Sequence, residues 1–493
     1  MGLIQRQGFK FSIVNWLGIL IGALSSLYVF PNALEEYGLV RFILDTSTLL
    51  FPLVSLGSNS VIIRFFPYFE DQKTGHHGFL GLMLWWTIIG FAIVSIFCFI
   101  FKDPIIARYK DSSPLFQQYL WLVLPSLLLT ALNNVFYRFS VNFNRIVIPS
   151  ILLEVSQKIV LPILVLAYLQ KWLTLTWMLY GLMGYLIAVV IGFIGYVVHL
   201  KAWNIRPDFA FMDTKMRREM RSYALHGIIG GFALLLVTKL DSWLVGTMIN
   251  LKKSGIYSIS AFVANVIEVP ARAVIGIGVP LMSKYWKENN QAEIENLYQK
   301  TSINLLILGL LLFGTFWVSV DAFFRIMANG VEMSQGKWVI FLLGLGRIVD
   351  MSTGLNNHIL IYSDKFRYSY LQLFVPTLIS LGLGITLTSW YGIEGAAMAN
   401  LLAVVAYNAT SIGINWYFFG YQPFTWASVK VILIAIGVYI VVMAIPQPAN
   451  VYVSILMRSS LFIVIGITAI VGLGISPDLN GLISKIINKK VLK

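Results

Sequence analysis

Long apolar runs follow one another along almost the whole chain. They are continuous and far longer than the roughly 10 residues of a membrane-barrel strand, so they predict transmembrane helices, each needing about 20 mostly apolar residues. The first run is too long for a signal peptide, and no clear small-x-small cleavage site ends it, so we expect it to be helix 1. About 14 spans are predicted, at 10–32, 39–63, 78–101, 114–138, 146–169, 173–198, 223–249, 254–281, 302–324, 336–361, 369–389, 392–418, 425–445 and 451–475.

The composition excludes most other classes of protein. Hydrophobic residues make up 58% of the 493 positions and charged residues 12%, about half of the roughly 25% that is usual in soluble proteins. A water-soluble shell cannot be built from this chain, and a disordered protein, a secreted disulfide scaffold and a DNA-binding domain are excluded as well. The single cysteine, Cys98, lies in an apolar run and is expected to pack as an inert thiol.

The positions of lysine and arginine predict the orientation of the spans. With the N-terminus inside, the inner loops and tail hold Arg6, Lys10, Lys73, Arg145, Lys201, Arg206, Lys215, Arg217, Arg218, Arg221, Lys284, Lys287, Lys300, Lys365, Arg367, Lys485, Lys489, Lys490 and Lys493. The outer loops hold only Lys102, Arg108, Lys110, Lys171, Lys252, Lys253, Arg325 and Lys337. Cytoplasmic loops carry such an excess, so both termini are expected in the cytoplasm. Much of the net charge of +14 then reflects topology and requires no nucleic acid.

The longest loop, at about 199–222, contains a basic segment that follows Asp213. Asp213 is expected to cap a short helix that lies on the inner membrane face. We interpret this segment as a topology anchor and linker, with a specific site for lipid head groups as the alternative.

The two halves on either side of this loop share five motifs in the same order. Gly18-x-x-x-Gly22 corresponds to Gly227-x-x-x-Gly231, a spacing that allows close helix approach. The other pairs are Glu35-Glu-Tyr-Gly38 with Lys252-Lys-Ser-Gly255, Tyr68-Phe-Glu-Asp-Gln72 with Tyr285-Trp-Lys-Glu-Asn289, Leu132-Asn-Asn134 with Leu355-Asn-Asn357, and Tyr180-Gly-x-x-Gly184 with Tyr391-Gly-x-x-Gly395. Each repeat then has six helices, an even number, so the copies are parallel and related by an axis along the membrane normal.

This repeat predicts an all-α integral membrane protein with two six-helix lobes, a cavity between them and two extra C-terminal helices. The expected parts are an N-lobe at 1–200, a cytoplasmic linker at 201–222, a C-lobe at 223–420, helices 13 and 14 at 421–475, and a basic cytoplasmic tail at 476–493. Two-lobed bundles are typical of transporters, and no selectivity-filter sequence points to a channel.

Charged residues inside the spans are candidate functional residues, because a charge in the membrane is costly. The cations are Arg41, Lys158, Lys239, Arg272 and Arg347. Most have an acid three or four residues away on the same helix face, in the pairs Arg41–Asp45, Glu154–Lys158, Glu268–Arg272 and Arg347–Asp350. Lys239 and Asp241 are two apart and need separate partners. The pairs are either internal ion pairs or part of a site for an anionic substrate, and Arg272 and Lys239, near mid-span, favour the substrate site.

Other polar residues offer fewer possibilities. Asn133-Asn134 and Asn356-Asn357 are expected to form hydrogen bonds between helices, with hydrogen bonds to sugar hydroxyls as the functional alternative. The histidines show no metal-ligand spacing, and His76-His77 is expected to be a solvated turn. There is no P-loop and no nucleophile elbow. The sequence therefore predicts no catalytic residues, no metal and no cofactor, and a transporter rather than an enzyme.

Several local sequences are similar to those of one family. They are Gly255-Ile-Tyr-Ser-Ile-Ser260 entering helix 8, Pro280-Leu-Met-Ser-Lys284 followed by Leu297-Tyr298 leaving it, and Tyr391-Gly-Ile-Glu-Gly-Ala-Ala397 starting helix 12. With the six-plus-six-plus-two pattern, they make the chain resemble the polysaccharide-flippase branch (O-antigen or capsule, Wzx-type) of the multidrug/oligosaccharidyl-lipid/polysaccharide exporter superfamily. The resemblance covers the whole chain, but its motifs are structural and name no substrate.

The resemblance implies a function and a site. Such proteins move a lipid-linked oligosaccharide, typically on undecaprenyl pyrophosphate, across the bacterial inner membrane by alternating access. Helices 1, 2, 7 and 8 would line the cavity, which places Arg41, Lys239, Asp241, Glu268 and Arg272 in or near it, with Asp241 or Glu268 coupling transport to proton or sodium exchange. The implied partners are the lipid-linked oligosaccharide, membrane lipids and other glycan-assembly proteins, and no nucleic acid.

Three alternatives remain at this point. A drug exporter of the same superfamily typically has 12 helices and often an acid in helix 1, which is absent between Lys10 and Pro31. A membrane polymerase of glycan units is expected to carry a large outer loop, whereas the outer loops here are short. A component of a glycan-assembly complex without transport activity would not need the intramembrane charges.

Overall fold

The computed structural model of the chain describes residues 3–109, 113–143 and 145–481. Within these ranges every regular element is helical. Eleven helices are long and apolar enough to cross a membrane, or up to 13 if each of two bent pairs forms one span. The 51-residue helix α19 (Ser369–Phe419) also has non-helical backbone at Gly392, so it contains two of the expected runs. This confirms an all-α membrane protein with about 14 transmembrane helices. The tail lysines from Lys485 to Lys493, and Lys110, lie outside the described residues.

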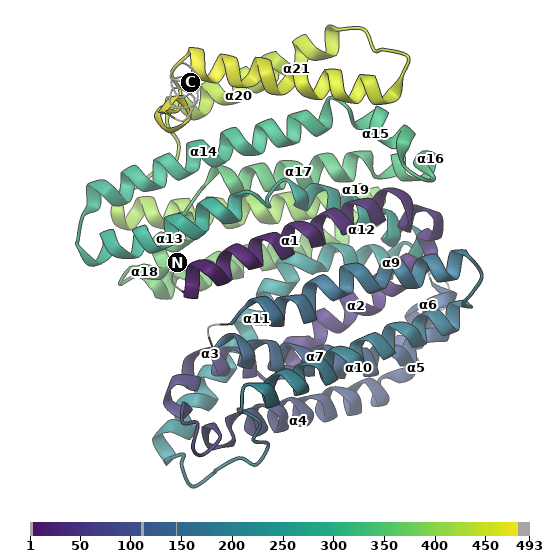
Figure 1. Cartoon of the computed structure of the whole chain (residues 1–493), viewed down its shortest axis with the longest axis vertical. Helices are drawn as coiled ribbons and strands as arrows, with labels where there is room; N and C mark the ends of the chain where they lie inside the picture. Colours follow the sequence, from purple (N-terminus) through teal and green to yellow (C-terminus); the bar gives the residue numbers. More distant parts are fainter. Residues whose placement is uncertain (1–2, 110–112, 144, 482–493) are drawn as a thin grey trace. The chain divides into compact units, whose positions relative to one another are not determined.

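The first compact unit comprises residues 1–259. In it α4, α7 and α10 lie side by side, and α2 packs on α4 and α7 (Figure 1). Phenylalanines such as Phe69, Phe79 and Phe193 fill its core with almost no exposed surface. Its helices are α1 (Leu3–Tyr28), α2 (Leu34–Ser55), α3 (Ser58–Phe69), α4 (Phe79–Ile100), α5 (Lys102–Tyr109), α6 (Pro114–Tyr119), α7 (Val123–Val141), α8 (Val147–Ser150), α9 (Ser156–Leu169), α10 (Leu175–His199), α11 (Thr214–Met248) and the first half of α12 (Leu251–Val266).

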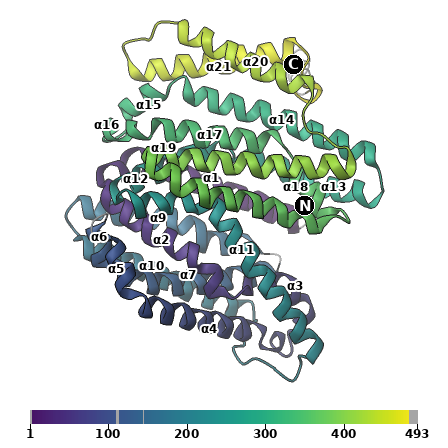
Figure 2. The same cartoon turned by 180° about the vertical axis from the view of Figure 1, so that it is seen from behind.

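The second compact unit comprises residues 260–493. Here α14, α17 and α19 lie side by side (Figure 2), and the last two helices, α20 and α21, pack on α14. Besides α19 and the end of α12, its helices are α13 (Ala271–Lys287), α14 (Gln291–Trp317), α15 (Val320–Ile326), α16 (Gly330–Met333), α17 (Lys337–Ser352), α18 (Asn356–Tyr362), α20 (Trp426–Ala444) and α21 (Val451–Gly472).

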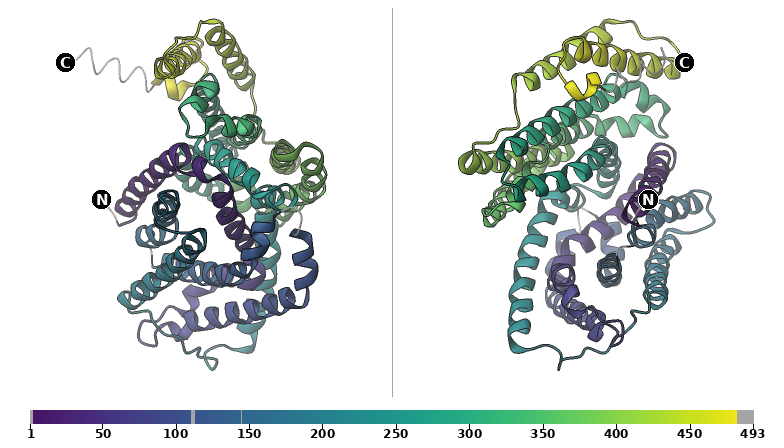
Figure 3. Two further views of the ribbon diagram at one scale, coloured as in Figure 1. Left: turned by 90° about the vertical axis from the view of Figure 1, so that its right-hand side faces the viewer. Right: turned by 60° about the vertical axis from the view of Figure 1, so that its left-hand side comes forward.

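The basic segment after Asp213 is the beginning of a transmembrane helix. Asp213 caps it as predicted, since its Oδ1 accepts a hydrogen bond from the Met216 amide at 2.6 Å. The expectation of a separate short helix was wrong, because neither glycine nor proline interrupts the chain before Gly227. The helix α11 continues for 35 residues to Met248, and Figure 3 (right) shows it as one long teal helix.

A turn between α3 and α4 holds the loop that precedes α11. Asn204 donates a hydrogen bond to the Thr74 carbonyl at 3.0 Å. His77 Nδ1 lies 3.3 Å from Asp208 Oδ2, and the His77 ring stacks on Phe211 with the ring centroids 3.7 Å apart. The interpretation of His76 as solvated was wrong: it is 1% exposed. We call the contacts of residues 70–78 with Asn204, Asp208 and Phe211 the loop clasp. Two of its carboxylates have a pKa below the ordinary 3.8: Asp208 through a hydrogen bond with His77, and Asp71 through a hydrogen bond from the Lys73 amide.

Candidate functional site

One carboxylate on α2, that of Asp45, contacts polar side chains of α11. Asp45 is 3% exposed. Arg41, one turn earlier, donates from Nη2 to its Oδ1 at 3.3 Å, as the spacing predicted. Two further contacts come from α11: Lys239 Nζ lies 3.7 Å from the same oxygen, and Ser242 Oγ donates to Oδ2 at 2.9 Å. We call these four residues the Asp45 cluster.

Asp241 has a different environment from its neighbour Lys239. Tyr257, a fully buried residue of α12, donates its hydroxyl to Asp241 Oδ2 at 2.6 Å. The Ser242 amide donates to Oδ1 at 2.8 Å. The prediction that Lys239 and Asp241 have separate partners is therefore confirmed. Asp241 joins α11 to α12, whereas Lys239 joins α11 to α2.

The charges predicted to pair along helices 8 and 10 pair between helices instead. Glu268 lies in the turn between α12 and α13, which are bent by 53°, so it does not share a helix face with Arg272. Its Oε2 accepts from Arg347 Nη1 at 3.3 Å. The same-helix pairing of Glu268 with Arg272 was therefore wrong. Arg347 and Asp350 do lie three residues apart on α17, but the ion pair that the structure describes for Arg347 is the one with Glu268. Arg272 is exposed, with no ion pair among the described residues.

The second unit also holds a buried network of amides centred on Asn356. This residue begins α18, where the predicted helix 336–361 breaks between α17 and α18. The hydrogen bonds are Tyr298 Oη to Asn356 Oδ1 at 2.9 Å, Asn415 Nδ2 to the same oxygen at 2.7 Å, Asn356 Nδ2 to the Asn408 carbonyl at 3.4 Å, Thr353 Oγ1 to Asn408 Oδ1 at 2.7 Å, and Asn408 Nδ2 to Asp350 Oδ1 at 3.1 Å. The expectation of interhelical hydrogen bonds is confirmed for Asn356.

The equivalent asparagines of the first unit make simpler contacts. Asn133, 1% exposed, donates to the Leu186 carbonyl of α10 at 3.3 Å, which confirms an interhelical bond. Asn134 donates to the Thr130 carbonyl of its own helix at 2.9 Å. Asn357 is partly buried in α18. Contact with sugar hydroxyls stays a prediction for all of them.

The role of Glu154 and Lys158, as an internal ion pair or as part of a site for an anionic substrate, stays a prediction. Lys158 lies on α9 against Gly18 of α1, where a Cβ would come 3.2 Å from the Lys158 Cδ. The glycine spacing in helix 1 thus gives room to a long basic side chain. Glu154 is exposed.

Sequence reasoning missed one buried cation, Arg458. It lies on α21, 5% exposed, and its guanidinium donates to the carbonyls of Val318 at 3.4 Å and Ile445 at 3.2 Å. These two residues are the C-caps of α14 and α20, where helix carbonyls lack intrahelical partners and carry partial negative charge. An arginine in the last span without a nearby acid was the signal in the sequence.

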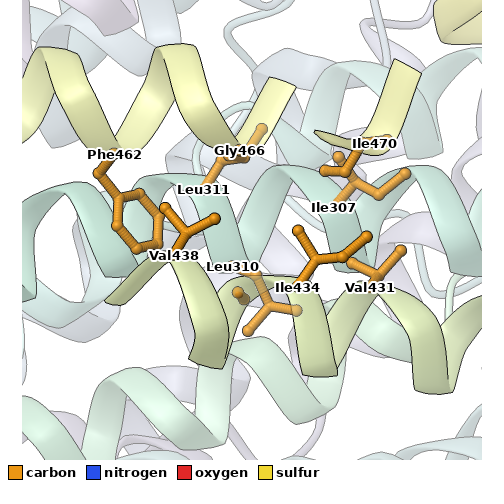
Figure 4. A pocket seen from close by; sticks show the side chains of 10 residues that line it. Ile307, Leu310, Leu311, Val431, Ile434, Val438, Phe462, Gly466 and Ile470 are labelled. Atoms are coloured by element: carbon orange, nitrogen blue, oxygen red, sulfur yellow. The ribbon is translucent and has the colours of Figure 1, made fainter. Parts of the chain in front are cut away.

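A small apolar pocket lies between α14 and the last two helices, which pack on it around the pocket. Figure 4 shows it lined by carbon side chains, among them Leu311 of α14, Val438 of α20 and Phe462 of α21. No lining residue is polar, so the pocket offers no hydrogen bond to a ligand. Phe462 fills space beside Gly314, where a Cβ would overlap its ring.

Solved structures with the same fold are membrane transporters. The structure is similar to the lipid II flippase MurJ in an inward closed conformation, with a TM-score of 0.73, 12% identity and coverage of 98% of this chain and 99% of that one. It is also similar to an inward-facing multidrug resistance MATE family transporter, with a TM-score of 0.61, 11% identity and coverage of 83% of this chain and 94% of that one. A Vibrio cholerae MATE transporter matches with a TM-score of 0.55, 15% identity and coverage of 85% of this chain and 98% of that one. At these identities the likeness concerns the fold.

The chain therefore has the fold that these flippase and multidrug transporter structures share. No curated protein matches the sequence. The family model described as polysaccharide biosynthesis protein matches residues 33–286, more than half of the chain. The chain belongs to this family, as the resemblance predicted.

Proposed function

We propose that this chain is a flippase that moves an oligosaccharide linked to undecaprenyl pyrophosphate from the cytoplasmic to the periplasmic leaflet of the bacterial inner membrane. Transport would follow alternating access, with both termini in the cytoplasm. The observation that carries the proposal is membership of the polysaccharide biosynthesis family in a chain whose spans contain several cations. Other glycan-assembly proteins would supply the substrate.

The cations would bind the pyrophosphate. In the first unit, Arg41 and Lys239 share one carboxylate, Asp45, and the Lys239 side chain is 36% exposed. The partly exposed Lys239 ammonium can donate to an anionic ligand, and Arg41 lies beside it on the same carboxylate. In the second unit, Arg272 is exposed and has no ion pair among the described residues, so it would be available to the same ligand. We extend the proposal to Arg347, which is held by Glu268.

The energy source we propose is proton or sodium exchange at Asp241 or Glu268. Asp241 is one candidate, because it is an acid inside a span that joins α11 to α12 through the Tyr257 hydroxyl. Glu268 is held by Arg347, and an ion pair explains its position without any coupling role. Export measured over a range of external pH and sodium concentrations would distinguish Asp241→Asn from Glu268→Gln.

Deletion of the gene tests the proposal. We expect loss of one surface glycan and accumulation of its lipid-linked precursor in the cytoplasmic leaflet. Lys239→Ala should fail to restore export at normal protein abundance, whereas Lys284→Ala, which removes an exposed lysine, should restore it. Intact glycans together with new sensitivity to toxic organic cations would favour the multidrug exporter. Loss of glycan polymer without precursor accumulation would favour an assembly component without transport activity.

A further inference from the structure

The helices α2 and α12 touch at repeat-equivalent glycines. A Cβ at Gly38 would overlap the carbonyl oxygen of Leu251, and a Cβ at Gly255 would overlap that of Leu34. Each glycine therefore lies directly against the backbone of the opposite helix. The two positions end the repeated motifs Glu35-Glu-Tyr-Gly38 and Lys252-Lys-Ser-Gly255, so the repeat brings its two copies of one motif into mutual contact.

The contact continues along α2 as a seam. One turn beyond Gly38, the Phe42 ring occupies the space that a Cβ at Gly246 of α11 would need. Ser242 and Lys239 then reach Asp45. From Leu34 to Asp45 the seam extends about 16 Å along α2 at 1.5 Å per residue. We call it the glycine seam.

The seam has the properties of a contact that can open. Its first three levels are van der Waals contacts, which are lost without leaving a polar group unpaired. At its last level Asp45 would lose Lys239 and Ser242, but it would retain Arg41 on its own helix. Beyond Asp45 the contact is ordinary at Pro52, which would lie 3.8 Å from a Cβ at Gly231 of α11. The chain comes close to α11 again at Gly57, where a Cβ would overlap the Ala224 carbonyl.

We propose that the glycine seam is the outer gate of the transporter, closed in this structure, and that its opening releases substrate to the periplasm. The proposal rests on the proposed function and on the orientation that puts the first residues of α2 and α12 at the periplasmic face. Glycine is needed at positions 38 and 255 because any side chain there would hold the two backbones apart. Alanine should therefore shift the transporter toward the outward-open state.

The test measures access from outside. In a Cys98→Ser background, Ser258→Cys serves as the reporter, since Ser258 is 8% exposed and lies one turn beyond Gly255. We expect Gly38→Ala and Gly255→Ala to raise its labelling by a membrane-impermeant maleimide, added to the periplasmic face, about tenfold, which corresponds to a modest shift in population. Both should also abolish glycan export. The control is Gly184→Ala, where no heavy atom lies within 4 Å of the added Cβ.

Several results would overturn the gate. One is unchanged labelling with retained export, and another is faster labelling only from the cytoplasmic face. If both glycine variants lower protein abundance, Gly246→Ala replaces them, with Phe42→Leu as its compensating change. The single variant should then speed labelling and the double variant slow it again, and any other pattern contradicts the proposal. Labelling does not depend on the substrate, so a failed flippase assignment and a failed gate give different results.

Discussion

The two units place the same sequence motif in different surroundings. Leu132-Asn-Asn134 lies inside the continuous helix α7, and Asn133 makes one hydrogen bond to α10. Leu355-Asn-Asn357 lies at the break between α17 and α18, and Asn356 bonds to three residues on two further helices, α14 and α19. In the first unit the dense polar contacts belong instead to the Asp45 cluster. One unit therefore concentrates charges and the other concentrates amides.

This difference has an energetic consequence. A charge that loses its partner in a low-dielectric region costs far more than an amide that loses one of several hydrogen bonds. The Asp45 cluster should then be the more sensitive region, and it is also the one that meets α11 at the glycine seam. The amide network holds α14, α17, α18 and α19 of the second unit together and involves one acid, Asp350.

The largest effect is expected for Asp45→Ala. It leaves Arg41 and Lys239 without their carboxylate and should cost about 3 kcal/mol of stability, near the low end for a broken buried pair because Lys239 is partly exposed. Thermal unfolding of the purified protein in detergent measures this. Asp321→Ala is the control. It breaks an ion pair with Lys337 in which the Asp321 side chain is 59% exposed, so it should cost at most about 1 kcal/mol. Equal destabilisation by the two variants would refute the ranking.

A smaller effect is expected for Asn356→Ala. It removes the acceptor of Tyr298 and Asn415, so we expect a loss of about 1–3 kcal/mol. Asn133→Ala should lose about 0.6 kcal/mol, the average for an interhelical hydrogen bond in a membrane protein. The same unfolding assay compares them. If Asn133→Ala were the more damaging change, the contrast between the two copies of the motif would be wrong.

The smallest effect concerns the loop clasp and pH. Asp208 has a folded pKa below 3.8, so its contribution to stability is present at neutral pH and is lost only as the pH falls through that lowered pKa. We therefore expect the contribution of Asp208 itself to change only in acid, below about pH 5, where aspartates titrate. Asp208→Asn should reduce the acid-induced loosening that hydrogen exchange of residues 70–78 reports. Acid-induced loosening that is unchanged in Asp208→Asn would contradict this account.

The fold was predictable because a membrane helix must satisfy its backbone internally, which makes each span a continuous apolar run. The site was predictable only within one helix. Arg41–Asp45 pairs as expected because α2 is continuous there, whereas Glu268 and Arg272 are separated by the break before α13. Spacing along one helix says nothing about partners on another helix, so neither Ser242 nor the pairing of Glu268 with Arg347 was predicted.

The most direct test of the central claim is translocation by the purified protein. Liposomes would carry a fluorescent oligosaccharide on undecaprenyl pyrophosphate, and a membrane-impermeant quencher would report its movement between leaflets. We predict protein-dependent movement that Lys239→Ala slows and Lys284→Ala leaves unchanged, with an unrelated organic cation failing to compete. If the oligosaccharide stays in its original leaflet under both proton and sodium gradients while the protein is folded, the flippase assignment is contradicted.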